Sequence, residues 1–356
     1  MNAPHKVGVL TFHRCINYGS YWQARCLVEA LRARGHDAVI LDHHSRRVNI
    51  AEWKCAFRPV LPTPVPQSDY PLYRQKIQKF FTSFCSLPLS RPFALENPSD
   101  MEPCDLVVVG SDEVWNLRHP WYGTCALFFG SGVRAPRLVS YAASFGNYHA
   151  EWGLDPVWAD QLCRFDAISV RDDNSRAIIN TALGFDPALV LDPCLQFVPQ
   201  PAGDWHAPSR PFVAVYGHNF SDSFIREVQR WAKTRGYLLV SIGYRNDWAD
   251  QQWITAGPDE FAHAMKHAEA VATNFFHGCV FALRNARPFV CETSFYRSNK
   301  IRCLMAMIGG EQHIASENTP AAVYDTCLGE PLAAELLRTI EHFRKTSEAF
   351  LAQALA

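Results

Sequence analysis

The sequence predicts an α/β fold with two doubly wound domains that face a cleft, and three observations lead to this prediction. The chain has 356 residues, which is more than one core comfortably fills and enough for two domains. Short apolar runs alternate with segments of helical periodicity in two separate blocks. Residues 200–211 lie between the blocks and hold several prolines and a glycine, so they are the best candidate for a linker.

The first block opens with a β-α-β unit. Residues 6–12 (KVGVLTF) form an apolar run typical of a buried parallel strand, and a helical pattern follows over 20–34. The next strand is expected at 38–41, which predicts a right-handed parallel crossover. Five prolines between 58 and 71 exclude a regular helix or a central strand there. Further strands are expected at 106–109, 138–142, 167–170 and 188–191, and further helices at 72–84 and 173–183.

The second block repeats the alternation and sets the predicted domain limits. Its strands are expected at 212–216, 237–242, 269–272 and 288–290, and its helices at 221–235, 258–267, 298–308 and 331–355. The last helix has an apolar stripe, which favours packing back on the first domain over binding a membrane. We therefore assign 1–199 to an N-terminal domain, 200–211 to the linker, 212–325 to a C-terminal domain and 326–356 to the returning helix.

Composition narrows the class of protein. Hydrophobic residues make up 48% of the chain, charged residues 19%, and the net charge is −1, so no nucleic-acid footprint is expected. The N-terminus lacks the apolar core of a signal peptide, and no apolar run is long enough to span a bilayer. The 12 cysteines include no C-x-x-C pair. We expect reduced thiols in a cytoplasmic protein, with no metal site implied.

The most informative turn lies between the strand at 269–272 and the short helix that follows it. His277 and Gly278 stand there, at the carboxyl edge of the predicted second sheet. Ligands of open α/β sheets bind at this edge, and a helix N-terminus offers N–H groups to an anion. A histidine at such a turn can supply charge or a proton, although an isolated one is more often bonded to backbone.

Polar residues also follow the predicted strands of the first domain. The turns there contain Asn17 and Gly19, then the run from Ser111 and Asp112 to Trp115 and Asn116, and then Ser144. A structural turn at 17–19 and a helix cap by Ser111 or Asp112 are equally open interpretations. Aromatic residues such as Trp115 stack on sugars but belong more often to a core.

Basic residues complete the set of candidates. Arg171 follows the strand at 167–170, where a guanidinium can bind a carboxylate in a bidentate fashion. An ion pair of Arg171 with Asp172 or Asp192 is an equally good interpretation. In the second domain, the segment 297–302 places Lys300 and Arg302 at a helix start, against the helix dipole, which suggests an anionic ligand.

Taken in order, several blocks resemble the polysaccharide pyruvyl transferase family. They are LTFHRCINYGSYWQARCLVEALRARGHDAVILD, DLVVVGSDEVWN, VSYAASFG, ISVRDD, LVLDPCL and ATNFFHGCVFALRNARPFV. Each block is weakly specific, and the ordered set is strong. The resemblance implies two Rossmann-like domains, similar to B-type glycosyltransferases. It also implies transfer of pyruvyl from phosphoenolpyruvate, as co-substrate, to a sugar hydroxyl pair, with no further cofactor.

The resemblance assigns roles to the candidates. Arg171, His277, Gly278, Lys300 and Arg302 match the donor-binding cluster, with His277 as the general acid. Asp112 is a candidate base, and the acceptor side holds Asn17, Gly19, Ser111, Asp112, Trp115, Asn116 and Ser144. The implied acceptor is a lipid- or nucleotide-linked saccharide of a surface polysaccharide, which allows a peripheral association with the membrane. The sequence leaves the oligomeric state open.

One departure keeps other functions open. Many relatives carry arginine or serine just before the histidine, where this chain has Phe275 and Phe276. A changed donor or a catalytically inactive binding role would fit this loss of a cation. A sugar-nucleotide-dependent glycosyltransferase of the same architecture is the further alternative, favoured by nucleotide binding and undercut by phosphoenolpyruvate consumption.

Overall fold

The computed structural model describes residues 5–293 and 298–356 and divides into two units. Unit 1 consists of the described part of Met1–Glu52 together with Phe84–Pro199 and Glu341–Ala356; unit 2 consists of Trp53–Ser83 and Gln200–Ile340. Arg297, the first residue of the predicted basic segment, lies outside the described residues. Each unit is built on one parallel sheet, so the predicted α/β class is confirmed.

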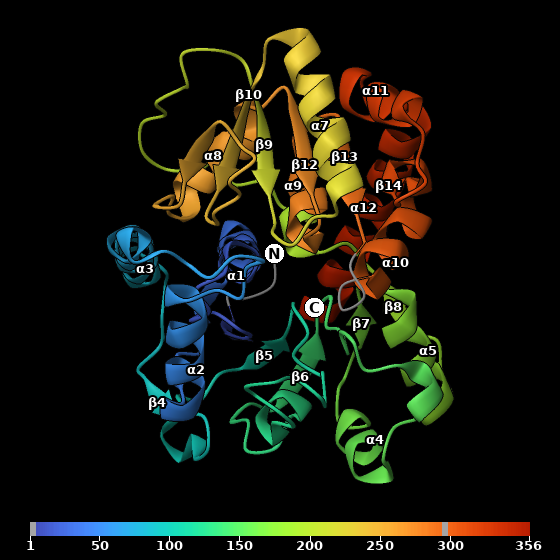
Figure 1. Cartoon of the computed structure of the whole chain (residues 1–356). Helices are drawn as coiled ribbons and strands as arrows, with labels where there is room; N and C mark the ends of the chain where they lie inside the picture. The colour runs from blue at the N-terminus through green and yellow to red at the C-terminus, as the bar shows by residue number, and fades with distance from the viewer. Residues whose placement is uncertain (1–4, 294–297) are drawn as a thin grey trace. The chain divides into compact units, whose positions relative to one another are not determined.

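The sheet of unit 1 has the strand order β2-β1-β5-β6, all parallel. Single bridges, Val139 with Ala167 and Ala143 with Val170, continue it towards the pair β7-β8 (Figure 1). Both faces of these strands are buried, and their apolar residues therefore form the core of unit 1. The elements are β1 (Lys6–Leu10), α1 (Tyr18–Ala33), β2 (Asp37–Ile40), β3 (His43–His44), β4 (Phe93–Ala94), β5 (Leu106–Val109), β6 (Arg137–Ser140), α4 (Pro156–Leu162), β7 (Ser169–Val170), α5 (Asp173–Leu183), β8 (Ala188–Leu189) and α6 (Pro193–Gln196).

The sheet of unit 2 is doubly wound. Val213 and Val215 belong to the cluster that α7 and α11 cover, whereas Tyr216 meets Phe261 of α8 at 4.7 Å between ring centroids. Alternate residues of one strand therefore face helices on opposite sides. The strand order is β11-β10-β9-β12-β13-β14. The elements are β9 (Phe212–Tyr216), α7 (Asp222–Arg235), β10 (Leu238–Ile242), β11 (Gln251–Trp253), α8 (Pro258–His267), β12 (Ala270–Thr273), α9 (Phe276–Arg284), β13 (Phe289–Glu292), α10 (Ser298–Ile308), β14 (Ile314–Ala315) and α11 (Ala321–Gly329).

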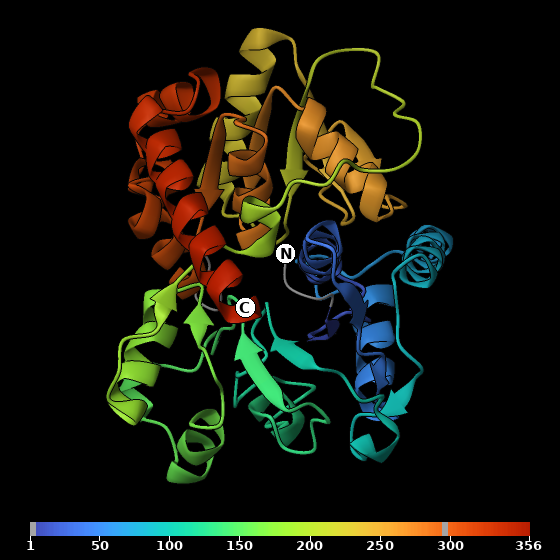
Figure 2. The ribbon, with the colours of Figure 1, turned by 180° about the vertical axis from the view of Figure 1, so that it is seen from behind.

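In three further helices, the chain passes from one unit to the other within the helix. They are α2 (Arg46–Phe57), α3 (Tyr70–Cys85) and α12 (Ala334–Leu355), the long red helix of Figure 2. The sequence did not predict α2 or α11, whereas α3 and α12 lie close to the helices expected at 72–84 and 331–355. In unit 1, the Ser347 hydroxyl of α12 accepts a hydrogen bond from Leu191 N at 2.9 Å.

The grouping of residues 53–83 with unit 2 differs from the predicted domain limits. Within unit 2, Asp69 pairs with Arg245, and the Lys76 ammonium donates to the carbonyl of Gly243 at 2.8 Å. Lys79 pairs with Glu260 of α8 at 2.6 Å. These long-range contacts, which no local pattern encodes, attach α3 to the unit built from the second block.

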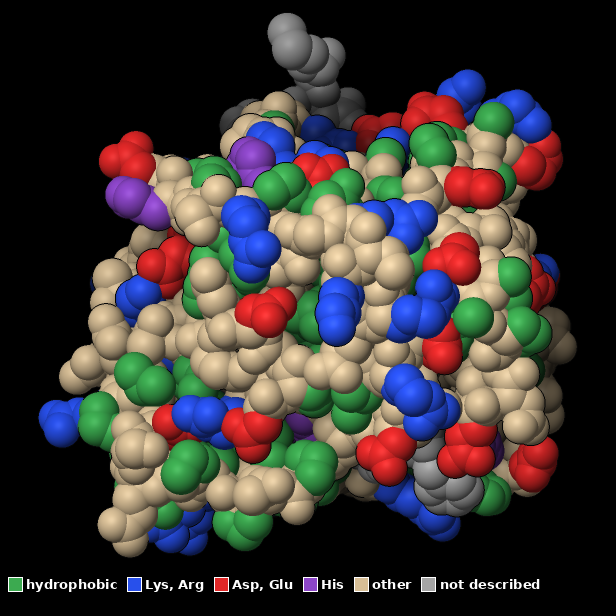
Figure 3. All heavy atoms as spheres, turned by 45° about the horizontal axis from the view of Figure 1, so that its top comes forward, with side chains coloured by type: hydrophobic (Ala, Val, Ile, Leu, Met, Phe, Trp, Pro, Cys, Tyr) green, Lys and Arg blue, Asp and Glu red, His purple; other side chains and the backbone are tan. Residues whose placement is uncertain are grey.

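Surface features agree with a near-neutral chain. On the face shown in Figure 3, acidic and basic side chains are interspersed, with no large region of one sign. Among the described helices, none combines the length and the apolar character that crossing a bilayer requires.

Candidate functional site

The carboxyl edge of the unit 1 sheet gathers charged side chains from three strands. After β5, Gly110 turns the chain with φ +114°, and a Cβ there would lie 2.4 Å from the carbonyl oxygen of Tyr141. Only glycine permits this close turn, which brings Ser111 and Asp112 to the edge. Arg171 follows β7, and Asp192 follows β8.

Arg171 is held between two carboxylates. Its guanidinium donates to Asp192 at 2.7 Å and to Asp112 at 3.1 Å, and its side chain is 2% exposed. Burial by itself lowers the pKa of Arg171, but the charges of Asp112 and Asp192 outweigh it and raise that pKa above its ordinary value. The ion pair considered from the sequence is thus present with Asp192, while Asp172 instead caps α5 by accepting from Ser175 N.

Asp112 and Ser111 are built into the same network. Asp112 accepts from the Ser20 hydroxyl at 2.8 Å and from Glu113 N at 2.9 Å. Ser111 is completely buried, and its hydroxyl lies 3.4 Å from the Arg171 guanidinium. No helix follows them within the described chain before residue 126, so the alternative that they cap a helix does not apply.

Three other predicted acceptor residues make local structural contacts. The Asn17 side chain caps α1, accepting from Gly19 N at 2.8 Å and from Ser20 N at 3.2 Å. Ser144 is buried and donates to Asp172 at 2.6 Å. These contacts position the first turn of α1 and the turn after β6 at the sheet edge.

Trp115 and Asn116 occupy the loop after β5 and are buried. Trp115 has no exposed surface, and its indole N–H donates to the carbonyl of Phe128 at 2.8 Å, so its ring belongs to the core of unit 1. Asn116 donates to Glu113 at 2.7 Å and is 3% exposed. Trp115 therefore supports the loop in this structure and presents no ring face to a sugar.

A buried acidic residue at the same edge was missed by the sequence interpretation. Glu52 of α2 is 7% exposed and hydrogen-bonds the Cys15 thiol and the backbone of Ile16. Burial, aided by the charge of Asp112, raises the pKa of Glu52 to about 7. The Cys15 sulfur lies 3.9 Å from the Tyr122 hydroxyl. No sequence signal identified Glu52, because its helix was not predicted.

Glu52 makes stability depend on pH. Its pKa rises from 4.5 to about 7 on folding, so its penalty is absent below pH 4.5, grows as pH rises from 4.5 to 7 and is fully present above pH 7. The shift corresponds to about 3 kcal/mol. Glu52→Gln is therefore expected to gain stability over the wild type at pH 8 but little at pH 4. Thermal unfolding at both pH values measures this, with exposed Glu317→Gln as control. Equal differences at the two pH values would contradict the assignment.

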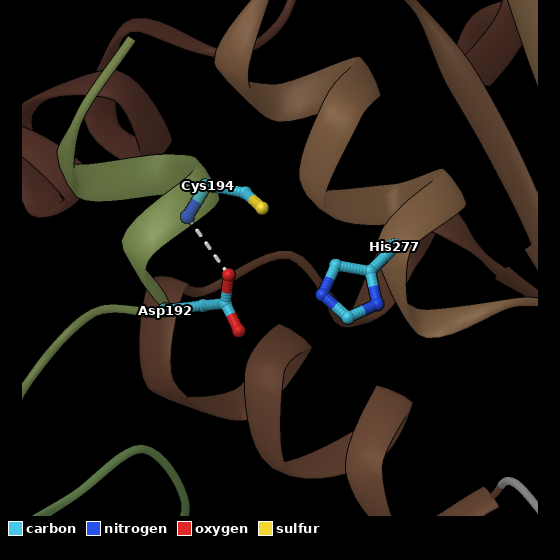
Figure 4. A group of neighbouring side chains, drawn as sticks. All are labelled: Asp192, Cys194 and His277. Atoms are coloured by element: carbon cyan, nitrogen blue, oxygen red, sulfur yellow. Dashed lines mark hydrogen bonds between the residues drawn. The ribbon is translucent and has the colours of Figure 1, made fainter. Parts of the chain in front are cut away.

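In unit 2, His277 and Gly278 begin α9 directly after β12, as the sequence predicted (Figure 4). The N-cap residue is Phe275, whose side chain cannot accept a hydrogen bond from the helix. His277 is half-buried, and its ring lies edge-on to that of Phe276 at 5.1 Å between centroids. Figure 4 also shows Asp192 accepting a hydrogen bond from Cys194 N at the start of α6, at 2.9 Å.

Gly278 is required by the close approach of α9 to β12. A Cβ at this position would lie 2.0 Å from the Thr273 hydroxyl oxygen and 2.7 Å from Thr273 Cβ. Thr273 cannot rotate away easily, because its hydroxyl donates to the carbonyl of Tyr216 at 2.6 Å. The glycine therefore sets the helix start, and with it His277, against the end of the strand.

Gly278→Ala is expected to destabilise unit 2 by about 1–3 kcal/mol, since the added methyl overpacks the helix start. Thermal or urea unfolding measures the loss. Gly329→Ala in α11 is the matched control, because its Cβ would meet the end of the flexible Arg235 side chain at 3.2 Å and the Trp231 ring only at an ordinary contact distance of 3.6 Å. If the two variants were equally stable, the start of α9 would be able to move and accommodate the methyl group without loss of stability.

Lys300 and Arg302 lie in the first half of α10, after β13. Lys300 is half-buried and Arg302 is exposed. The structure thus places the predicted donor residues of unit 2 on two helices, α9 and α10.

Further polar residues at the edge of unit 2 were given no role from the sequence. Asn274, 1% exposed, donates to the carbonyl of His218 at 2.7 Å, and its own carbonyl oxygen finds no hydrogen-bond partner among the described residues. Asn246 follows β10 and donates to the carbonyl of Gly217 at 2.9 Å. Lys76, whose ammonium donates to the carbonyl of Gly243 just after β10, is also buried, and burial lowers its pKa to about 7. The position of Asn274 immediately after a predicted strand was the available signal.

Comparison with solved structures finds matches that cover almost the whole chain at low identity. The glycosyltransferase SnogD from Streptomyces nogalater is 13% identical, with a TM-score of 0.43 over 99% of this chain and 100% of that chain. The UDP-GlcNAc 2-epimerase from Methanocaldococcus jannaschii is 10% identical, with a TM-score of 0.48 over 96% and 99% of the two chains. The UDP-GlcNAc 2-epimerase from Neisseria meningitidis is 9% identical, with a TM-score of 0.47 over 98% and 99%.

Comparison of sequences is more specific. No curated protein matches the chain. The model of the family described as polysaccharide pyruvyl transferase matches residues 17–293, well over half of the chain. This range runs from the cap of α1 through the edge residues Asp112 and Arg171 to the histidine turn of α9 and on past β13. The chain therefore belongs to the polysaccharide pyruvyl transferase family.

Proposed function

We propose that the protein transfers the pyruvyl group of phosphoenolpyruvate to two hydroxyls of a saccharide and so forms a cyclic ketal. The acceptor is a lipid- or nucleotide-linked saccharide on its way to a surface polysaccharide, and the reaction takes place in the cytoplasm. Family membership supports the reaction class. The observation that carries the donor assignment is the histidine turn, where Gly278 seats His277 at the N-terminus of α9.

The donor is assigned to the edge of unit 2 because of its charge. Phosphoenolpyruvate carries a phosphate and a carboxylate, and a helix N-terminus at the carboxyl end of a strand attracts such anions. His277 lies in the first turn of α9, and Lys300 and Arg302 add cations on α10. These groups are suited to hold the phosphate and to stabilise the charge that it gains on leaving.

The reaction needs one acid and a base for each hydroxyl. His277 donates a proton to C3 of the enol, which becomes a methyl group and leaves C2 electrophilic. One sugar hydroxyl adds to C2 and loses its proton, then the second hydroxyl displaces the phosphate by breaking its bond to C2. The products are the ketal and inorganic phosphate, so the atoms balance without an oxidant or reductant.

The acceptor is assigned to the edge of unit 1. Asp112 is the candidate base, since its carboxylate lies at the sheet edge, contacts the Arg171 guanidinium and accepts a hydrogen bond from Ser20. We also assign Arg171 to binding the donor carboxylate. In this role its guanidinium would contact the donor in addition to Asp112 and Asp192, which it already contacts. The buried residues Ser111, Asn116 and Ser144 support this edge.

Calorimetric titration of the full chain with phosphoenolpyruvate tests the proposal, with inorganic phosphate and UDP-glucose titrated separately. We expect saturable binding of phosphoenolpyruvate that is competed by phosphate. Binding of UDP-glucose with no response to phosphoenolpyruvate would overturn the proposal in favour of a glycosyltransferase. If neither phosphoenolpyruvate nor UDP-glucose binds, the protein shares the family fold but uses a different donor or has a binding role without catalysis.

A further inference from the structure

Helix α2 has one buried face, and apolar residues also lie on the opposite side of the helix. Val48, Glu52 and Ala56, spaced four residues apart, are at most 8% exposed and face the protein interior. Ile50 and Trp53 lie on the other side of the helix and are 45% and 47% exposed. A helix that packs on one core needs one buried face, so packing does not explain the exposed Ile50 and Trp53.

The apolar face continues along the helix to Phe57, which is half-buried and packs against Tyr70 at 5.2 Å between ring centroids. Ile50, Trp53 and Phe57 are spaced by three and four residues, which places them on one face. The rings of Trp53 and Phe57 stack at 5.4 Å with an interplanar angle of 10°. Val60, just beyond the helix, is 80% exposed and extends the apolar surface. Single exposed apolar residues are ordinary, whereas an aligned and stacked set is not.

The charges around this apolar face are of one sign. Arg46, Lys54 and Arg58 are exposed beside it, on a chain whose net charge is −1. The acidic residues of this part of the chain, Glu52 and Asp69, are buried. Every exposed charged side chain between residues 45 and 83 is therefore basic.

We propose that the apolar face of α2, formed by the exposed Ile50 and Trp53 with the half-buried Phe57 and flanked by Arg46, Lys54 and Arg58, docks the protein on an anionic bilayer surface. Aromatic and aliphatic side chains bind at the headgroup boundary, and each nearby lysine or arginine adds attraction to anionic lipids. A second copy is a poorer occupant, because a two-fold contact would place the same basic residues against one another. The docking surface does not depend on the proposed reaction.

Sedimentation of the full chain with lipid vesicles tests the docking surface. The probes are vesicles of phosphatidylcholine alone and vesicles in which about one third is phosphatidylglycerol. We expect binding to the anionic vesicles only, reduced by high salt. Trp53→Ala and the double variant Lys54→Glu/Arg58→Glu should each weaken the partition by about tenfold or more.

Matched controls keep the test specific. Trp152→Ala removes an equally exposed tryptophan, and Lys233→Glu/Lys345→Glu reverses two exposed charges elsewhere. Both controls should bind like the wild type, and all variants should keep the wild-type melting temperature because the positions are on the surface. Failure of the wild type to bind anionic vesicles, or equal losses in the controls, would overturn the proposal. So would self-association that depends on Trp53 in the absence of vesicle binding.

Discussion

Replacing His277 by alanine is expected to lower the rate of ketal formation by about a hundredfold to ten-thousandfold, the range that a positioned general acid contributes. The structure places His277 in the first turn of α9, where it can both face an anion and deliver a proton. His277→Gln should lose as much rate, because an amide can hydrogen-bond the donor but cannot transfer a proton. Phosphate release with phosphoenolpyruvate and an acceptor measures the loss.

Two further readouts separate the acid role from a structural one. In D₂O, the wild-type enzyme should place one deuterium in the ketal methyl group, because the proton on C3 comes from the acid. His277→Gln should bind phosphoenolpyruvate within about tenfold of the wild type while its turnover falls much further. His342→Ala, at an exposed position on α12, is the control and should keep full activity. Full turnover by His277→Ala would refute the assignment.

Replacing Arg171 by leucine is expected to destabilise unit 1 by about 3–5 kcal/mol, because it leaves two buried carboxylates without their counter-ion. Asp112 and Asp192 have side chains that are 9% and 1% exposed, so water cannot take the place of the guanidinium. Urea unfolding followed by circular dichroism measures the loss. Arg176→Leu is the control: it breaks the pair of Arg176 with the half-exposed Asp186 and should cost far less stability, because water screens that pair.

A combined variant distinguishes the two roles that the sequence left open for Arg171. Arg171→Leu together with Asp112→Asn and Asp192→Asn removes the buried charges and should recover much of the lost stability. If Arg171 also clamps the donor carboxylate, this variant should bind phosphoenolpyruvate at least about tenfold more weakly than Asp112→Asn/Asp192→Asn. Equal binding would confine Arg171 to positioning the two aspartates. Equal stability of Arg171→Leu and the wild type would contradict the geometry itself.

The sequence by itself determined the class of fold and the location of the candidate edges. Apolar runs followed by helical periodicity predict parallel strands and their crossovers, since both patterns are local. The strands β1, β5, β9 and β12 lie where those runs occur, and the linker prolines separate the two blocks. Because the carboxyl ends of parallel strands share one edge, the positions of Asp112 and Arg171 in unit 1 followed from the strand assignments alone.

Only the tertiary structure decided what those side chains contact. Arg171 could have paired with Asp172 or Asp192, and the choice of Asp192 depends on where β8 ends in space. Trp115 could have faced a ligand, but long-range packing buries it in the core of unit 1.

Contacts between segments that are far apart in sequence also explain the other features that the sequence did not predict. Residues 53–83 belong to unit 2 because ion pairs such as Lys79 with Glu260 join segments far apart in sequence. Glu52 is buried and hard to ionise because the fold removes it from water, against Cys15 and near Asp112. Periodicity reports which face of a helix is apolar, whereas burial, pairing and protonation depend on neighbours that only the folded chain supplies.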